Sequence, residues 1–385
     1  MHMTKAMARA GRTLSNTGDE YRKDIAMVSA YVATVVNTKL PSLLQPIPGW
    51  SDYQKAYLLA ETTALAWTNQ VMGPLSQTPL AVKRADAAVR LFFAAAAQAL
   101  VILQRDPTNP GARESLLNQL NGLQSEIVLA AGLVKIVIDD LENYNGTLPA
   151  QSANLAALAD AMISASSADQ QKIATLRSQI AALQAQIDDL TRQIVALGIV
   201  DGAAVVFGVV ALAFAGPAGI PVALLLGAAL VTASIYIAVD SEKITEKKSD
   251  IEKTTATMNE ITMDMALLNE SATAFGDLAS RSLAIQQNLE GILSAWDAVS
   301  KAVGLVKQDI SQATDDEKQA LWDAVAADLA AAEADWTTVL GDVDVVAIDL
   351  EGNAAKISLG MSRNEVAAAI AATPTTTLVR YLNAA

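Results

Sequence analysis

Few residues of this chain could carry out catalysis. The sequence contains one histidine, His2, and no cysteine. A thiol nucleophile, a disulfide framework and a zinc–thiolate site are therefore excluded, and a single histidine is a poor basis for a catalytic triad or a transition-metal site. No phosphate-binding loop or dinucleotide fingerprint occurs either. The sequence predicts no catalytic residue, no metal and no cofactor, so the protein is not expected to be an enzyme.

An acidic cluster near the C-terminus is the nearest approach to a metal site. It consists of Asp342, Asp344, Asp349 and Glu351. A calcium loop of the helix–loop–helix type needs a glycine at its sixth position and a bidentate carboxylate at its twelfth, and both are missing here. We interpret these residues as solvated surface.

The charge balance restricts the possible partners. The formal net charge is −14, whereas nucleic-acid binding requires clusters of Lys and Arg that displace counterions from phosphates. No nucleic-acid partner is expected. The same charge argues against electrostatic adhesion to anionic lipid, so any membrane binding must come from burial of apolar surface.

One segment has the composition for that burial. Residues 202–239 form a run of 38 residues without a charge, divided by a turn sequence at Gly216–Pro221. A helix needs about 20 residues to span a bilayer. The second arm has 18 uncharged residues, 222–239, and the first must extend back to about Ile194 to span. The segment predicts a membrane-inserting hairpin, and lipid is its expected partner.

Three groups of residues define this candidate site. The expected membrane-inserting residues are Val205, Val206, Phe207, Val209, Val210, Leu212, Phe214, Pro217, Ile220, Pro221, Val222, Leu224, Leu225, Leu226, Leu230, Val231, Ile235 and Ile237. The expected hinge residues are Gly202, Gly208, Gly216, Gly219 and Gly227. Asp201 and Asp240 bound the hairpin, with Asp201 read as a capping or solvated residue or, alternatively, as a pore-lumen carboxylate.

The arms favour two conformations. Valines such as Val205, Val206 and Val209 favour strand, and the residues from Val231 to Val239 alternate in polarity with the period of a strand. Val231, Ile235 and Val239 also fall on one face of a helix. The hairpin could be strands in one state and helices in another.

Long helices must position this hairpin. A seam of apolar residues at spacings of three and four precedes it: Ile173, Leu176, Ile180, Leu183, Ile187, Leu190, Ile194 and Leu197. A second follows it: Met258, Ile261, Met265, Leu268, Ala272, Phe275 and Ala279. A third comprises Trp322, Val325, Leu329, Ala332, Trp336, Val339, Val343 and Val346, and a weaker one Leu123, Ile127, Val134, Ile138 and Leu141. The seams predict an all-α fold, an elongated bundle of long antiparallel helices.

Prolines predict where the N-terminal helices end. They favour helices at about 19–39, 51–72, 80–105 and 111–145. Residues 150–216 and 222–373 lack proline, so they could hold very long helices, with a return helix from Ser241 to about Gly304. We expect a helical tail domain, 1–200 with 240–385, and a hydrophobic head, 201–239.

The seam at 173–197, the hairpin at 202–239 and the return helix together resemble the cytolysin A superfamily of α-helical pore-forming toxins. The group includes components of haemolysin BL, non-haemolytic enterotoxin and Gram-negative tripartite toxins. The resemblance implies a secreted, soluble monomer whose head inserts into the target-cell membrane. It also implies a homo-oligomeric pore and allows for partner toxin subunits.

Three other interpretations stay open. A type III-style translocator also combines a coiled coil with two apolar spans. A structural coiled-coil protein could be anchored permanently by the hairpin. The hairpin could also be a buried core element of a soluble protein.

Overall fold

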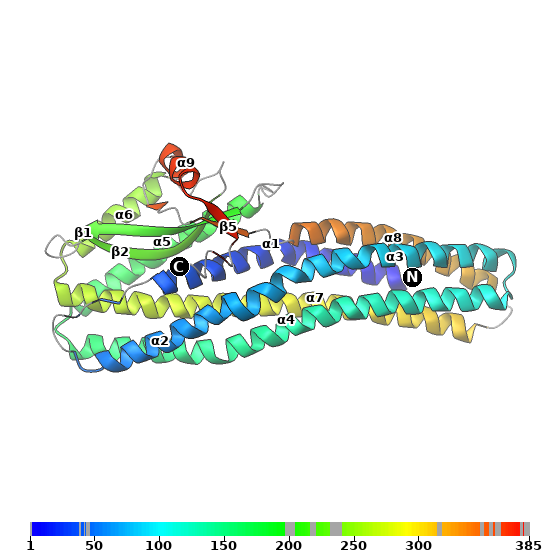
Figure 1. Cartoon of the computed structure of the whole chain (residues 1–385), viewed down its shortest axis with the longest axis horizontal. Helices are drawn as coiled ribbons and strands as arrows, with labels where there is room; N and C mark the ends of the chain where they lie inside the picture. The colour runs from blue at the N-terminus through cyan, green and yellow to red at the C-terminus, as the bar shows by residue number, and fades with distance from the viewer. Residues whose placement is uncertain are drawn as a thin grey trace. The chain divides into compact units, whose positions relative to one another are not determined.

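The computed structural model consists mainly of long helices, with a small sheet beside them (Figure 1). It describes residues 2–37, 40–41, 43, 47–196, 205–215, 221–231, 241–313, 318–346, 350–353, 357–358, 363–377 and 380. The chain divides into two compact units, and several long helices contribute residues to both.

The first unit contains residues 1–22, 74–140 and 285–348. This unit includes most of α3 (Met72–Arg105) and the whole of α8 (Lys318–Val346). It also includes the start of α1 (His2–Asn37), the start of α4 (Pro110–Ala165) and the end of α7 (Glu260–Gln312). Tryptophans fill its core. Trp296 and Trp336 meet edge to face at 5.8 Å, and the indole N–H of Trp322 donates to the carbonyl of Pro107 at 3.1 Å.

A buried carboxylate fixes the start of α1 in this unit. Asp328 of α8 accepts hydrogen bonds from the backbone N–H groups of Met3 and Thr4, each at 3.1 Å, and from the Thr4 hydroxyl at 2.5 Å. These N–H groups have no partner within α1, because the first turn of a helix leaves its donors unpaired. Burial alone would raise the pKa of Asp328, but the donors from Thr4 and Met3 lower it to about 2.

The second unit contains residues 23–73, 141–284 and 349–385. It includes α2 (Trp50–Ala66), the π-helix η1 (Trp67–Val71), α5 (Gln170–Ala196), α6 (Ser241–Thr255), α9 (Arg363–Ala371) and the sheet. Aromatic rings pack between α2 and α7, where Tyr57 meets Phe275 edge to face at 5.5 Å. The Tyr53 hydroxyl donates to the carbonyl of Leu268 at 2.7 Å.

The sheet has five strands: β1 (Val205–Ala215), β2 (Pro221–Val231), β3 (Leu350–Asn353), β4 (Ile357–Ser358) and β5 (Thr375–Thr377). Its order is β2-β1-β3-β5, and β4 also pairs with β1. The helical bundle confirms the predicted fold class, and the hairpin adopts the strand form of the two that were anticipated. The sequence did not predict β3, β4 and β5.

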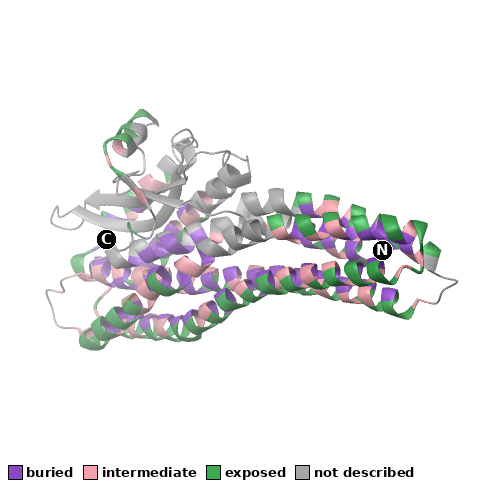
Figure 2. Ribbon diagram, turned by 45° about the vertical axis from the view of Figure 1, so that its right-hand side comes forward, coloured by how far each residue is buried: buried purple, intermediate pink, exposed green. Residues whose placement is uncertain are grey.

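The apolar seams form the core. Figure 2 shows the buried residues as stripes along the helices. Every described member of the four seams is buried except Ile261, which is half-buried. The side chains from Ile187 to Leu197 and from Val339 to Val346 lie outside the described residues. Glu351 belongs to β3 and Asp342 and Asp344 to α8, while Asp349 is not among the described residues.

Proline was the least reliable predictor of helix ends. The predicted stop between 72 and 80 is wrong, because α3 passes through Pro74 and Pro79. Pro74 lies in the first turn after η1, where a wider turn accommodates a residue without an N–H. The predicted end near 145 is also wrong, since α4 continues through Pro149 to Ala165. Likewise α1 starts at His2 rather than near residue 19.

The proline-free stretches, by contrast, include one helix break before the hairpin and another soon after it. One lies at residues 166–169, between α4 and α5, and the other at 256–259, between α6 and α7. The return helix is therefore two helices, and the second ends at Gln312 rather than near Gly304. Neither break contains proline or glycine, so tertiary contacts must hold the chain out of the helix there.

Candidate membrane-inserting hairpin

The predicted hairpin is an antiparallel strand pair. β1 and β2 pair from Val206 opposite Val231 to Ala215 opposite Pro221, with a register shift between Val209 and Ala211. Such a shift bends one strand and increases its twist. The two arms therefore store 11 residues each in the extended conformation.

The structure describes the backbone of most predicted inserting residues. Those from Val205 to Phe214 lie in β1, and those from Pro221 to Val231 lie in β2, as do the hinge glycines Gly208 in β1 and Gly227 in β2. The remaining candidates lie outside the described residues: Asp201, Gly202, Gly216, Pro217, Gly219, Ile220, Ile235, Ile237 and Asp240.

The C-terminal segment pairs with the hairpin on the other side of β1. β3 pairs in parallel with β1, placing Leu350 opposite Val205 and Glu351 opposite Val206. β4 pairs farther along, with Ile357 opposite Val210. These strands satisfy backbone donors and acceptors that an open strand edge would expose. The hairpin is thus held by a segment that the sequence analysis treated as surface.

Two helices flank the hairpin. α5 precedes it and contacts β2, α6 follows it and contacts β1, and α5 and α6 contact each other. Figure 1 shows the two green strands beside these helices. An inserting hairpin would therefore have to separate from α5, α6 and the C-terminal strands.

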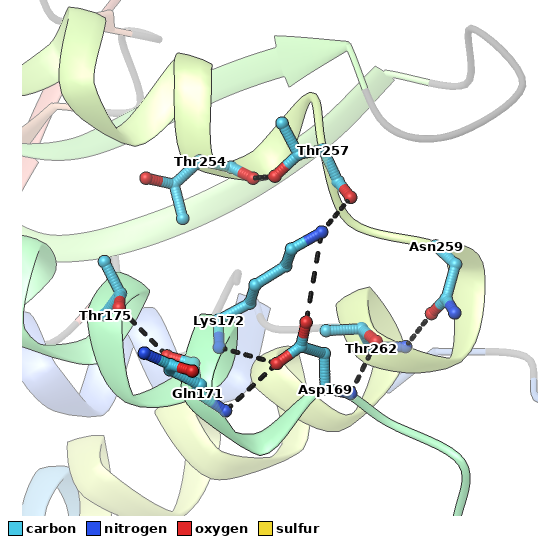
Figure 3. A network of polar contacts seen from close by, with 8 residues as sticks. All are labelled: Asp169, Gln171, Lys172, Thr175, Thr254, Thr257, Asn259 and Thr262. Carbon is cyan, nitrogen blue, oxygen red and sulfur yellow. Dashed lines mark hydrogen bonds and ion pairs between the residues drawn. The ribbon is translucent and has the colours of Figure 1, made fainter.

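A polar network fastens the two helix breaks together (Figure 3). We call Asp169, Lys172, Thr257, Asn259 and Thr262 the base cluster. The side chain of Asp169 caps α5, accepting from the N–H groups of Gln171 and Lys172 at 3.1 Å each. The side chain of Asn259 caps α7 in the same way, accepting from the N–H of Thr262 at 2.8 Å.

The base cluster also bonds across the two breaks. The ammonium of Lys172 donates to the carbonyl of Thr257 at 2.6 Å, and the backbone N–H of Asp169 donates to the hydroxyl of Thr262 at 3.0 Å. Each break thus supplies groups that stabilise the other. The cap at Asp169 has a sequence signal, an Asp just before the 173–197 seam, but the long-range bonds have none.

Charged groups lie between α5 and α7 as well. Burial raises the pKa of Glu270 on α7 to about 7, while Arg177 on α5 lowers it and Asp277 raises it. Burial, with the neighbouring Glu260, raises the pKa of Asp264 to about 6. Both carboxyls therefore take up a proton more readily than exposed ones, which lowers the cost of their partial burial on α7.

We expect Lys172→Ala to loosen the break between α6 and α7. The substitution removes the bond to Thr257 and leaves a carbonyl without its charged donor, a loss of about 1 kcal/mol at this half-exposed site. Amide hydrogen exchange at Thr257 and Met258 should then accelerate roughly fivefold. Thr175→Val is the matched control, because the Thr175 hydroxyl bonds only to Gln171 within α5. Equal exchange in the two variants would show that the lysine does not hold the break.

Two described helices are long and apolar enough, by length and composition, to cross a membrane. They are residues 86–105 of α3 and the helix α4. The core helices of soluble proteins pass the same test, so this finding does not displace the hairpin as the candidate site.

Searches with the sequence find no matching family model and no matching curated protein. Searches with the structure find soluble AhlB of the tripartite α-pore-forming toxin of Aeromonas hydrophila, with 17% identity, a TM-score of 0.62, and coverage of 97% of this chain and 100% of that one. The cytotoxin MakB of Vibrio cholerae has 12% identity, a TM-score of 0.73, and coverage of 96% and 98%. Soluble SmhB of the Serratia marcescens tripartite toxin has 14% identity, a TM-score of 0.63, and coverage of 97% and 99%.

The chain has the fold of α-pore-forming toxin components. The similarity covers 96–97% of this chain and therefore spans both units, and it confirms the predicted architecture. At these identities it establishes the fold alone, so the function has to be argued from this chain's own residues.

Proposed function

We propose that this protein is an α-helical pore-forming toxin component that inserts its hairpin, residues 202–239, into a target membrane. The observation that supports this most strongly is the combination of an uncharged 38-residue segment with storage as strands. A permanent span would be helical, because all backbone groups of a helix are paired within it. The edge of β1 is paired with the short strands β3 and β4. Such pairing can be broken when the hairpin leaves the sheet and enters a membrane.

The roles of the hairpin residues follow from insertion. The inserting residues supply the apolar surface, with Val, Leu, Ile and Phe each favouring the bilayer by about 0.3–0.6 kcal/mol. Glycines such as Gly208 and Gly227 impose little restriction on a backbone that changes from strand to helix. We propose residues 201–239 as the head, and 1–200 with 240–385 as the tail that carries it.

Assembly and localisation belong to the same proposal. One inserted hairpin encloses no channel, so a pore requires several copies of the chain. Partner subunits fit as well, since AhlB and SmhB are components of tripartite toxins. The protein would be secreted in soluble form and act at the target-cell membrane without a catalytic step.

The test is dye release from receptor-free liposomes, with flotation measured beside it on detergent-free protein. We expect Leu225→Arg, in the middle of β2, to reduce both. A charged side chain costs about 2.5–3.5 kcal/mol at the bilayer centre and less toward the turn end of the 222–239 arm, where Leu225 lies, so insertion should become roughly tenfold less favourable.

Leu59→Arg is the control, because Leu59 of α2 is already 57% exposed and the substitution adds the same charge. Dye release by Leu225→Arg at the rate of the parent chain would contradict insertion of the hairpin. Flotation without release would indicate a component that waits for partners. A chain that stays in the membrane pellet from the time of synthesis would favour a permanent anchor, and one insoluble without a chaperone would favour a translocator.

A further inference from the structure

An apolar seam in the first unit faces solvent. Along α3, positions Ala87, Leu91, Ala94, Gln98 and Val101 follow each other at spacings of four and three, and all are exposed. Leu91 is 70% exposed. No charged residue occurs between Arg90 and Arg105. A helix in a soluble monomer normally presents charged residues on its outer face.

The neighbouring helix extends this surface. On α4, Val128, Leu129 and Ile136 are each more than half exposed. The two helices approach closely, because a Cβ at Gly122 would lie 2.3 Å from the ring of Phe92. We call the exposed apolar residues of α3 and α4 the outer face: Ala87, Leu91, Ala94, Val101, Ile102, Val128, Leu129, Gly132 and Ile136.

The apolar residues of the outer face are not needed to fill the core of the first unit. The stretch of α3 from residue 91 to 104 is uncharged, yet only about a third of the window from residue 86 to 105 is buried. Its inward residues, including Val89, Phe93 and Leu100, already pack within the unit. The outward-facing residues of α3 are apolar as well. This side of the helix is therefore suited to contact with another molecule.

The spacing indicates what covers it. Alternating steps of four and three place residues on a line that packs against another helix, with small and large side chains interdigitating. The seam contains small residues at Ala87 and Ala94 and one polar residue, Gln98, of the kind that fixes register in helix pairs. A helix lying on a bilayer has the same spacing, so a flotation measurement has to separate contact with lipid from contact with protein.

The charges favour a second copy of this chain. Copies with a net charge of −14 repel each other over most of their surface. On the outer face, however, the charges are neutralised within each helix, with Arg90 paired to Asp86 at 2.8 Å and Lys135 to Asp139 at 2.9 Å. This neutrality allows two acidic chains to approach there.

We infer that the outer face of α3 and α4 is a two-fold contact between copies of this chain in the assembled form, in which the outer face of one copy packs against that of another. The inference rests on the proposed function, and it assigns the residues that bring protomers together. The hairpin then supplies membrane binding, while the outer face supplies association. The two steps should respond to different substitutions.

Cross-linking tests the contact directly, because the chain contains no cysteine. The full chain with Leu91→Cys is treated with a bismaleimide, in solution and on liposomes, and compared with Leu58→Cys, whose position in α2 is 59% exposed. On liposomes, the Leu91→Cys protein should form cross-linked dimers about tenfold more efficiently than the Leu58→Cys protein. Equal cross-linking of the two variants under both conditions overturns the inference.

A second pair of variants separates this contact from lipid binding. Leu91→Glu combined with Val101→Glu should reduce dye release at least about tenfold, because the contact would have to bury two carboxylates in place of two apolar side chains. Flotation should be unchanged, and Leu58→Glu should change neither. Loss of flotation in the double variant would mean that the outer face meets lipid, which overturns the inference. Failure of the parent chain to float contradicts the proposed function instead.

Discussion

A disulfide between β1 and β3 should abolish pore formation reversibly. In the Val206→Cys and Glu351→Cys double variant, the two cysteines replace directly opposed residues of a parallel strand pair. Their Cα atoms lie in strands about 4.8 Å apart, a separation that a disulfide can bridge. The oxidised protein should release no dye from liposomes, because the hairpin cannot leave the C-terminal strand, and a reductant should restore release.

A control variant makes this result specific. Ala213→Cys with Ala223→Cys joins the two arms of the hairpin at opposed positions, leaving β3 free. These positions lie five residues before and five residues after Ala218, so the link is compatible with strand and helix hairpins, and activity should persist. Dye release by the oxidised β1–β3 variant at the rate of its reduced form would show that the hairpin need not separate from the C-terminal segment.

Asp328→Ala should be the most destabilising single substitution among the charged residues discussed here. It leaves the buried N–H of Met3 and the half-buried N–H of Thr4 without their acceptor and removes the cap of α1, a loss of about 2–4 kcal/mol in the free energy of unfolding. Urea denaturation followed by circular dichroism measures the loss. Amide exchange in the first turn of α1 should accelerate as well.

The pH dependence provides a second readout. Because its pKa in the folded protein is lowered to about 2, Asp328 stabilises the fold above pH 4, and this contribution is lost as the pH falls toward 2. The Asp328→Ala protein should lack that part of the acid transition. Asp323→Ala is the matched control, since Asp323 lies on α8 and its carboxylate accepts a solvent-exposed hydrogen bond from Gln104 at 2.9 Å. A stability loss no larger than that of the control would contradict the capping role.

The parts of the fold that the sequence predicted depend on local periodicity. The 173–197 seam, the third seam and the hairpin with its Gly216–Pro221 turn are patterns within one segment, and they place the core and the site. The contacts that hold the hairpin are not local. Lys172 reaches Thr257 across 85 residues, and β3 is too short to stand out by composition.

The helix ends show the limits of single-residue rules. Proline was expected to end helices at 74, 79 and 149, yet these helices continue, because a long helix packed along its length can lose a hydrogen bond and remain stable. The breaks at 166–169 and 256–259 contain ordinary helix-compatible residues. They exist because the base cluster offers the backbone other partners. The caps at Asp169 and Asn259 are local, but the bonds from Lys172 to Thr257 and from Asp169 to Thr262 have no local pattern.

The parallel pairing of β1 with β3 also determines when during synthesis the hairpin can be completed. Leu350 follows its partner Val205 by 145 residues. At a synthesis rate of about 5–20 residues per second, the β1 edge waits roughly 7–30 seconds for its neighbour. During that interval the ribosome-bound chain presents an open, strongly apolar strand edge, a typical starting point for aggregation. Aggregation of the nascent chain should therefore compete with its folding until β3 has emerged.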